Sequence, residues 1–239
     1  FLPTIFLYYH RKYLKTVFWR VYFKVFGLVY NLSEKLQPRT YRPTTLTNSK
    51  FSAMITRSYL DIDPIVIYPP VDVAKYMPVG LSNYHRSNIV VTISRFDEVK
   101  RLETVVEIAK NVKNVQFMII GATSRVSGQT IKALHEKARK YGIENRVLLL
   151  TDARHEDKLK ILSTAKLYLH PMKYEHFGIS IVEAMASGLV PIVHKSGGPW
   201  LDILGGKQGI YGFGFEGVED AASHICLLYT SPSPRDRQK

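Results

Sequence analysis

The sequence predicts an α/β protein built on a parallel sheet that helices cover on both faces. Short apolar runs typical of buried strands alternate with segments of helical periodicity along most of the 239 residues. Residues 89–93 form one such run, Ile-Val-Val-Thr-Ile, as expected of a strand buried on both faces. Because such sheets bind ligands outside the carboxyl ends of their strands, we expect the functional side chains directly after strands.

Residues 5–32 predict one long helix near the start of the chain. This stretch has no Pro and one Gly, and aromatic residues alternate with cations along it. Five cations fall within 14 residues, and they are Arg11, Lys12, Lys15, Arg20 and Lys24. Charges are costly in hydrocarbon, so this helix is not expected to span a membrane.

Three interpretations of this helix remain open. It could pack on another domain with its cations solvated, or it could lie on an anionic membrane surface with its rings at headgroup depth. Basic and aromatic residues could also bind single-stranded nucleic acid, but no recognition module accompanies them, so no nucleic-acid partner is expected. The basic charge is local, because residues 1–60 hold ten Lys or Arg and one acid, whereas residues 61–225 are nearly neutral.

A composition change separates two expected domains. Residues 1–68, with short strands predicted at 44–47 and 65–68 and a helix from Ser49 to about Tyr59, are assigned to the end of a first domain. Residues 69–85 contain three Pro and little periodicity, which is typical of an interdomain connection. Residues 86–225 are assigned to a second, Rossmann-like domain.

The second domain shows regular alternation of strands and helices. Its helices have apolar residues at helical spacing, and Gly142 and Gly188 stand where helices are expected to end. The predicted elements are strand 89–93, helix 102–109, strand 115–120, helix 131–138, strand 147–150, helix 159–162, strand 167–170, helix 179–187, strand 190–193 and helix 199–204. This order predicts a parallel sheet.

Two stretches are left out of the predicted elements. Residues 212–217 match G-x-G-x-x-G, but no strand leads into them and no ribose-binding acid follows, so we interpret them as a glycine-rich loop. Residues 226–239 resemble a translated sequencing adaptor, the alternative being a natural Ser/Pro-rich tail, and they are excluded from the fold. The only cysteine, Cys226, lies there, so neither a disulfide framework nor a cysteine metal site is expected.

The strongest functional signal is a pair of carboxylates, Glu175 and Glu183, separated by seven residues. Glu175 is expected in a loop after a strand, and Glu183 in the first turns of the following helix. The unpaired backbone N–H groups at the start of that helix, around Gly178, Ile179 and Ser180, can cradle a diphosphate. Two solvated carboxylates would be the simpler explanation of this spacing, but the strand–Gly–helix–Gly–strand context favours a site.

A second signal follows the first strand of this domain. Ser94, Arg95 and Lys100 lie in a loop at the expected carboxyl edge of the sheet. Cations there could stabilise a departing nucleoside diphosphate. His170 and His176 flank the site, but two histidines without further ligands more often orient loops than bind zinc.

The segment Glu175–Pro199, reading EHFGISIVEAMASGLVPIVHKSGGP, resembles the signature of the retaining, nucleotide-sugar-dependent glycosyltransferases of group 1, which have two Rossmann-like domains (the GT-B fold). Residues 67–72 and 47–50 add to the resemblance, which covers about residues 40–220. It implies that this chain holds the donor-binding C-terminal domain and the last part of the acceptor-side domain.

The resemblance also implies roles for individual residues. Arg95 and Lys100 would hold the donor diphosphate, Glu175 would contact the donor sugar, and Glu183 would bind the ribose hydroxyls. The catalytic set is then Glu175, Arg95 and Lys100, and the donor-binding residues are Glu183, Phe177, Gly178, Ile179, Ser180 and Ser94. Members generally need no metal, so neither a metal nor another cofactor is expected.

The resemblance further implies transfer of a hexose, with mannose from GDP-mannose expected, to a lipid-linked oligosaccharide or other glycan at the cytosolic face of a membrane. The glycine-rich loop and the histidine of the family's first domain have no counterpart here, so this chain alone is expected to be inactive. The alternatives are a nucleotide-sugar-binding module without turnover and a basic protein that binds membrane surfaces through residues 5–32.

Overall fold

The computed structural model describes residues 16–36, 44–81 and 86–230. By its internal contacts the chain divides into two units. Unit 1 comprises residues 1–48 and 52–67, and unit 2 comprises residues 49–51 and 68–239.

Helix α3 of unit 1, Val17–Leu36, overlaps the long helix predicted at residues 5–32 and ends beyond it, at Leu36. Residues 5–15 of that prediction lie outside the described residues. Aromatic rings stack along the helix, with the centroids of Trp19 and Phe23 5.8 Å apart. In the described parts of the chain, no helix has the length and apolar character needed to cross a membrane.

The remainder of unit 1 contains a small parallel pairing. Strand β1, Leu46–Thr47, pairs with β2, Ile65–Val66, and the two strands have Leu46 opposite Ile65. Helix α4, Lys50–Leu60, follows β1 in the chain. These elements agree with the predicted strand–helix–strand order.

Unit 2 is built on a six-stranded sheet in which every pairing is parallel. Its strands are β3 (Ile89–Ile93), β4 (Gln116–Gly121), β5 (Val147–Thr151), β6 (Leu167–His170), β7 (Val190–His194) and β8 (Phe213–Phe215). Their spatial order is β5-β4-β3-β6-β7-β8. The chain builds outward from β3 to β5 and then returns to place β6 on the other side of β3. The order therefore reverses between β3 and β6, and crevices at such points bind ligands.

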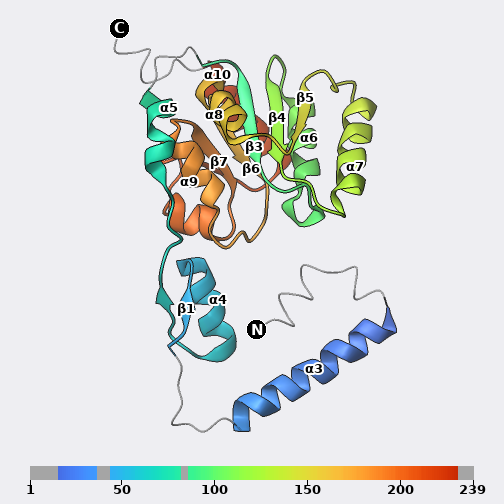
Figure 1. Cartoon of the computed structure of the whole chain (residues 1–239), viewed down its shortest axis with the longest axis vertical. Coiled ribbons are helices and arrows are strands. Elements are labelled where there is room, and N and C mark those ends of the chain that lie inside the picture. Colours follow the sequence, from blue (N-terminus) through green and yellow to red (C-terminus); the bar gives the residue numbers. More distant parts are fainter. Residues whose placement is uncertain (1–15, 37–43, 82–85, 231–239) are drawn as a thin grey trace. The chain divides into compact units, whose positions relative to one another are not determined.

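Helices cover both faces of this sheet (Figure 1). The helical segments of unit 2 are η1 (Val73–Lys75), α5 (Met77–Leu81), η2 (Glu98–Lys100), α6 (Leu102–Asn111), α7 (Ser127–Lys140), α8 (His155–Thr164), α9 (Ile179–Ala186), η3 (Pro199–Ile203) and α10 (Val218–Thr230). One core joins the sheet to α6, α7 and α10, and the other joins it to α5, α8 and α9.

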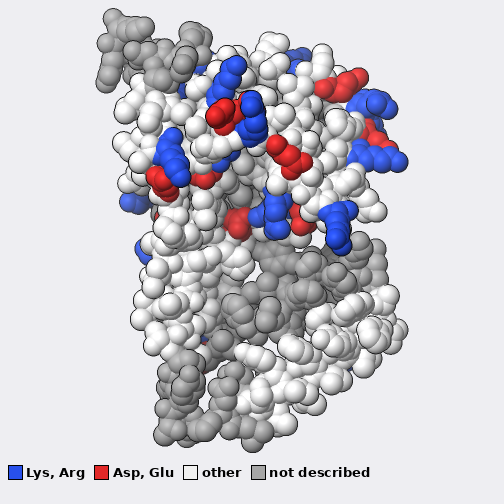
Figure 2. All heavy atoms as spheres, in the orientation of Figure 1, with Lys and Arg blue, Asp and Glu red and all other residues white. Residues whose placement is uncertain are grey.

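Successive side chains of the central strands enter opposite cores. In β6, Leu167 and Leu169 pack in the first core and Tyr168 packs in the second. In β3, Val90 and Val91 divide in the same way. Because side chains alternate across a strand, a strand buried on both faces needs an unbroken apolar run, which is why these segments were visible in the sequence. The surface of unit 2 shown in Figure 2 carries Lys and Arg interspersed with Asp and Glu.

The structure differs from three expectations. The described part of the expected connection, residues 69–81, carries η1 and α5 and belongs to unit 2, and Tyr76 is only 4% exposed in the second core. The stretch 212–217 contains strand β8, which pairs with β7, instead of a loop alone. Helix α10 continues to Thr230, and Leu228 and Tyr229 pack against the first core, although residues 226–239 were excluded from the fold.

Candidate active site

Two loops meet at the carboxyl edge of the sheet where the strand order reverses. Lys100 ends η2 after strand β3, and Glu175 lies in the loop after β6. The Nζ atom of Lys100 donates to Oε2 of Glu175 at 2.7 Å. Both side chains are largely buried, at 18% and 15% exposure. The structure thus brings together two of the three residues predicted to act in catalysis.

Glu175 is held by further contacts. Its Oε1 accepts the backbone N–H of His176 at 3.1 Å, and Nε2 of His170 lies 3.6 Å from Oε2. Burial raises the pKa of Glu175, but His170 and Lys100 outweigh it and hold this pKa well below the ordinary value. Glu175 is therefore a fixed negative charge at neutral pH, suited to accept hydrogen bonds from a sugar.

The sequence did not indicate His170 as a metal ligand. His170 is the last residue of β6, and its ring adjoins the Glu175 carboxylate. Its side chain is buried, and neither ring nitrogen has a hydrogen-bond partner among the residues that the structure describes. The ring stacks on Tyr168 with an interplanar angle of 17°. A buried polar group without a partner is unfavourable, so small movements that join His170 to Glu175 would be stabilising.

A second loop fixes the position of the loop that contains Glu175. Gly198 donates its N–H to the carbonyl of Glu175 at 2.8 Å, and Ser196 Oγ accepts the N–H of Tyr174 at 3.0 Å. A Cβ atom on Gly198 would lie 2.0 Å from the carbonyl oxygen of His176. A Cβ atom on Gly197 would likewise lie 2.4 Å from the carbonyl oxygen of Glu175. Backbone contact between the two loops therefore explains the glycine pair Gly197–Gly198.

Helix α9 begins beside this loop with free donors. Gly178 precedes the helix with φ +97°, and its carbonyl accepts the N–H of Ile181 at 3.0 Å. No described residue accepts a hydrogen bond from the backbone N–H of Ile179 or of Ser180. The hydroxyl of Tyr168 lies 2.8 Å from Ser180 Oγ, which fixes that side chain. Unpaired N–H groups and the helix dipole favour an anion at this position.

Glu183 has partners that the sequence did not indicate. It accepts hydrogen bonds from the Tyr76 hydroxyl at 2.7 Å and from Lys158 Nζ at 3.2 Å. Tyr76 lies in the stretch expected to be a connection, and Lys158 lies among other charged residues of α8. No spacing rule links these two positions to Glu183, so only the folded structure identifies them.

The other predicted residues lie less directly at this site. Arg95 follows β3 and is exposed, and its guanidinium forms no hydrogen bond or ion pair with any described residue. Ser94 Oγ donates to the carbonyl of Arg95 at 3.4 Å. Phe177 is half-buried, with its ring centroid 5.6 Å from that of Tyr68. Among the described residues, no cluster of His, Cys, Asp and Glu could hold a metal ion.

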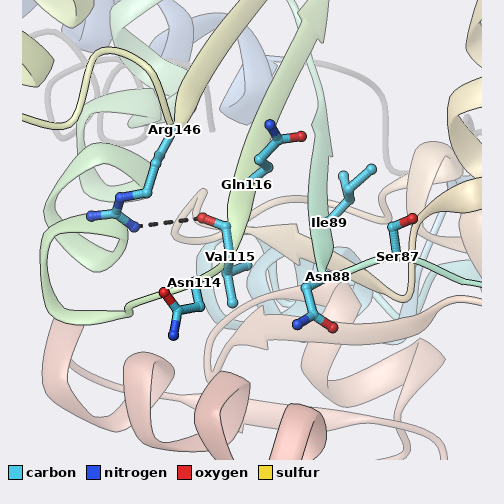
Figure 3. A pocket seen from close by; sticks show the side chains of 7 residues that line it. All are labelled: Ser87, Asn88, Ile89, Asn114, Val115, Gln116 and Arg146. Atoms are coloured by element: carbon cyan, nitrogen blue, oxygen red, sulfur yellow. Dashed lines mark hydrogen bonds between the residues drawn. The ribbon is translucent and has the colours of Figure 1, made fainter.

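A hollow of about 380 Å³ lies at the opposite edge of the sheet, at the amino ends of β3 and β4 (Figure 3). Its charged residue is Arg146, which donates to the carbonyl of Val112 at 2.6 Å and to that of Ala109 at 3.2 Å. Arg146 thus caps the end of helix α6, and its hydrogen bonds are used inside the fold. The Lys100–Glu175 edge is the stronger candidate site.

Comparison with known proteins identifies the family of this chain. The family model described as glycosyl transferases group 1 matches residues 78–239. The chain is 24% identical over 225 residues to the GDP-Man:Man(3)GlcNAc(2)-PP-Dol alpha-1,2-mannosyltransferase of Dictyostelium discoideum, covering 88% of this chain and 44% of that protein. It is 30% identical over 181 residues to the mouse protein of the same name, covering 68% of this chain and 36% of that protein. The chain therefore spans less than half the length of these relatives.

The fold is also similar to that of HepE from Anabaena, a crystal structure in complex with UDP and glucose. The TM-score is 0.66 at 22% identity, over 80% of this chain and 55% of HepE. This likeness confirms the predicted α/β fold with its parallel sheet. Because the family model matches well over half of the sequence, the chain belongs to the group 1 glycosyl transferases.

Proposed function

We propose that the protein transfers mannose from GDP-mannose to a lipid-linked oligosaccharide, with retention of the anomeric configuration. The relatives that cover most of this chain carry the name of that activity. The observation that carries the proposal is the buried Lys100–Glu175 pair beside the free amides of α9. This arrangement suits a sugar linked to a diphosphate. The cation and the helix start can bind the diphosphate, and the carboxylate can accept hydrogen bonds from the sugar.

Each group has a separate task in this proposal. The N–H groups of Ile179 and Ser180 receive the diphosphate, and Arg95 and Lys100 neutralise the charge that develops when the sugar leaves. Glu175 binds the hydroxyls of the sugar and so places its anomeric carbon next to the acceptor. Lys100 can serve both Glu175 and the diphosphate because an ammonium group has three donors.

A donor panel tests the proposal. Because this chain alone is expected to be inactive, transfer here and below is assayed on a chain completed with an acceptor-side domain. We expect mannose transfer from GDP-mannose, and at least tenfold less transfer from UDP-glucose or UDP-N-acetylglucosamine, because a site matched to one base and sugar leaves polar groups unpaired with another. No metal takes part in the proposed chemistry, so EDTA is expected to leave the rate unchanged. Equal rates with the three donors, or loss of the rate in EDTA that Mg²⁺ restores, would contradict it.

We also propose that the protein acts at the cytosolic face of a membrane, bound peripherally through the segment 5–32. The described part of this segment is helix α3, on which Phe18 and Val21 are exposed and Arg20 and Lys24 supply charge. Rings and cations on one helix suit the interface between headgroups and acyl chains.

Binding to lipid vesicles tests this location. The double charge reversal R20E/K24E is expected to weaken binding to phosphatidylserine-containing vesicles by about tenfold or more, since each cation near such a surface contributes about 1 kcal/mol. The difference should shrink as salt is raised. Lys132→Glu, an exposed change in α7, is the control and should bind as the unchanged protein does. Equal binding by R20E/K24E would show that α3 is not the contact.

A further inference from the structure

Three side chains from separate elements form a closed hydrogen-bonded cluster around Glu183. The Tyr76 hydroxyl donates to Oε1 of Glu183 at 2.7 Å. Lys158 Nζ lies 3.2 Å from Oε2 of Glu183 and 2.8 Å from the Tyr76 oxygen, to both of which it donates. Tyr76 follows η1, Lys158 lies in α8 and Glu183 lies in α9. The cluster therefore joins three neighbouring elements on one face of the sheet.

The cluster is largely shielded from solvent, and the protonation states of Lys158 and Tyr76 are well defined. Lys158 and Glu183 are 18% and 19% exposed, and Tyr76 is nearly fully buried. Burial lowers the pKa of Lys158, but its bonds to Tyr76 and Glu183 outweigh this and raise the pKa above the ordinary value. Burial likewise raises the pKa of Tyr76. Lys158 is thus a cation and Tyr76 a neutral O–H donor throughout the neutral range.

The number of donors leaves part of the carboxylate free. A carboxylate offers about four acceptor directions, two on each oxygen. Tyr76 takes one direction on Oε1, and Lys158 takes one on Oε2. One direction on each oxygen remains, which is the arrangement that accepts two adjacent hydroxyls at once. The plane of the carboxylate is fixed, because each oxygen is already tied to a different element.

The resemblance to the family already assigns the ribose hydroxyls of the donor to Glu183. We propose that Tyr76 and Lys158 are positioning residues, which hold the Glu183 carboxylate in the one orientation that accepts both vicinal hydroxyls at once. This inference rests on the proposed function, because it requires a nucleoside diphosphate at α9. Without Lys158, the Glu183 carboxylate can rotate. Binding of the ribose must then also fix its direction, and the conformational entropy lost in doing so weakens binding.

The test compares GDP with 2′-deoxy-GDP and 3′-deoxy-GDP by titration calorimetry, with no acceptor and no turnover needed. We expect the unchanged protein to bind GDP at least tenfold more tightly than either deoxy analogue, as is typical of hydrogen bonds to a charged group. In Lys158→Met this preference is expected to fall below threefold. Tyr76→Phe should also reduce the preference for GDP over the deoxy analogues. Lys158→Arg, which keeps a cationic donor, should retain most of the preference of the unchanged protein.

Lys160→Met is the matched control, since it removes the same charge from an exposed position of the same helix. It should keep the full ribose preference. A change in overall packing would weaken GDP and the deoxy analogues alike, so the ratio of affinities separates positioning from a merely structural role. Should Lys158→Met fold poorly, Tyr76→Phe supplies the same ratio.

The outcomes separate the two hypotheses. If the unchanged protein prefers GDP and both Lys158→Met and Tyr76→Phe keep that preference, the positioning role is overturned while the proposed function stands. If the unchanged protein binds GDP without ribose preference, the inference also fails. Binding of none of the three nucleotides would overturn the proposed function and this inference with it.

Discussion

Replacement of Glu175 by Gln is expected to lower kcat for mannose transfer by about 10²- to 10³-fold, the effect typical of removing one preorganised electrostatic contact. Gln has the same shape but no charge, so Lys100 loses its buried counter-ion at 2.7 Å and the sugar loses a charged acceptor. The affinity for GDP should change much less, because the diphosphate and the base are bound by other groups. Initial rates and calorimetric titration with GDP measure the two effects separately.

The control for this prediction is Glu103→Gln. Glu103 also accepts a hydrogen bond from a lysine, Lys137, at 2.8 Å, but it lies in α6 outside the candidate site. It should keep the full rate of transfer. A near-normal rate for Glu175→Gln would count decisively against the assignment of the site, whatever its effect on stability.

The sequence predicted the central sheet well because burial on both faces constrains residue type. Strands β3 and β6 begin and end at the predicted residues, 89–93 and 167–170. The sequence also placed Lys100 and Glu175 after strands, and so at one edge of a parallel sheet. It did not predict that β3 and β6 are neighbours or that the two side chains form a hydrogen bond. The expectation required only the strand positions, not the detailed contacts.

The elements that were missed depend on partners distant in the chain. Strand β8 is only three residues long, and its central residue is Gly214. An apolar run this short cannot be told from a loop in the sequence. Gln208 bonds both the N–H and the carbonyl of Gly214, at 2.9 Å and 3.1 Å, and β7 supplies the backbone partner. Tyr76 was hidden in the same way, because its segment has Pro but little periodicity, and only its packing against α8 and α9 identifies its role.

The second large effect is expected at Gly198, where the two loops touch. Gly198→Ala is expected to lower transfer by about 10²-fold and to destabilise the fold by about 1–3 kcal/mol, as overpacking does. The reason is contact and not backbone strain, because Gly198 has helical φ and ψ of −60° and −39° that alanine adopts readily. The added Cβ would lie 2.0 Å from the carbonyl oxygen of His176, so the loop that contains Glu175 must move.

Gly128→Ala provides the matched control for this change. Gly128 lies in helix α7, and a Cβ atom there would meet nothing within 4 Å. Alanine is the better helix former, so this variant should be more stable by about 0.5–1 kcal/mol and fully active. Thermal unfolding and the rate of transfer, measured for both variants, separate steric displacement from the loss of a glycine as such. If Gly198→Ala kept the full rate, residues 174–177 could shift without moving the Glu175 carboxylate, and the contact between the two loops would have no part in holding the sugar-binding group.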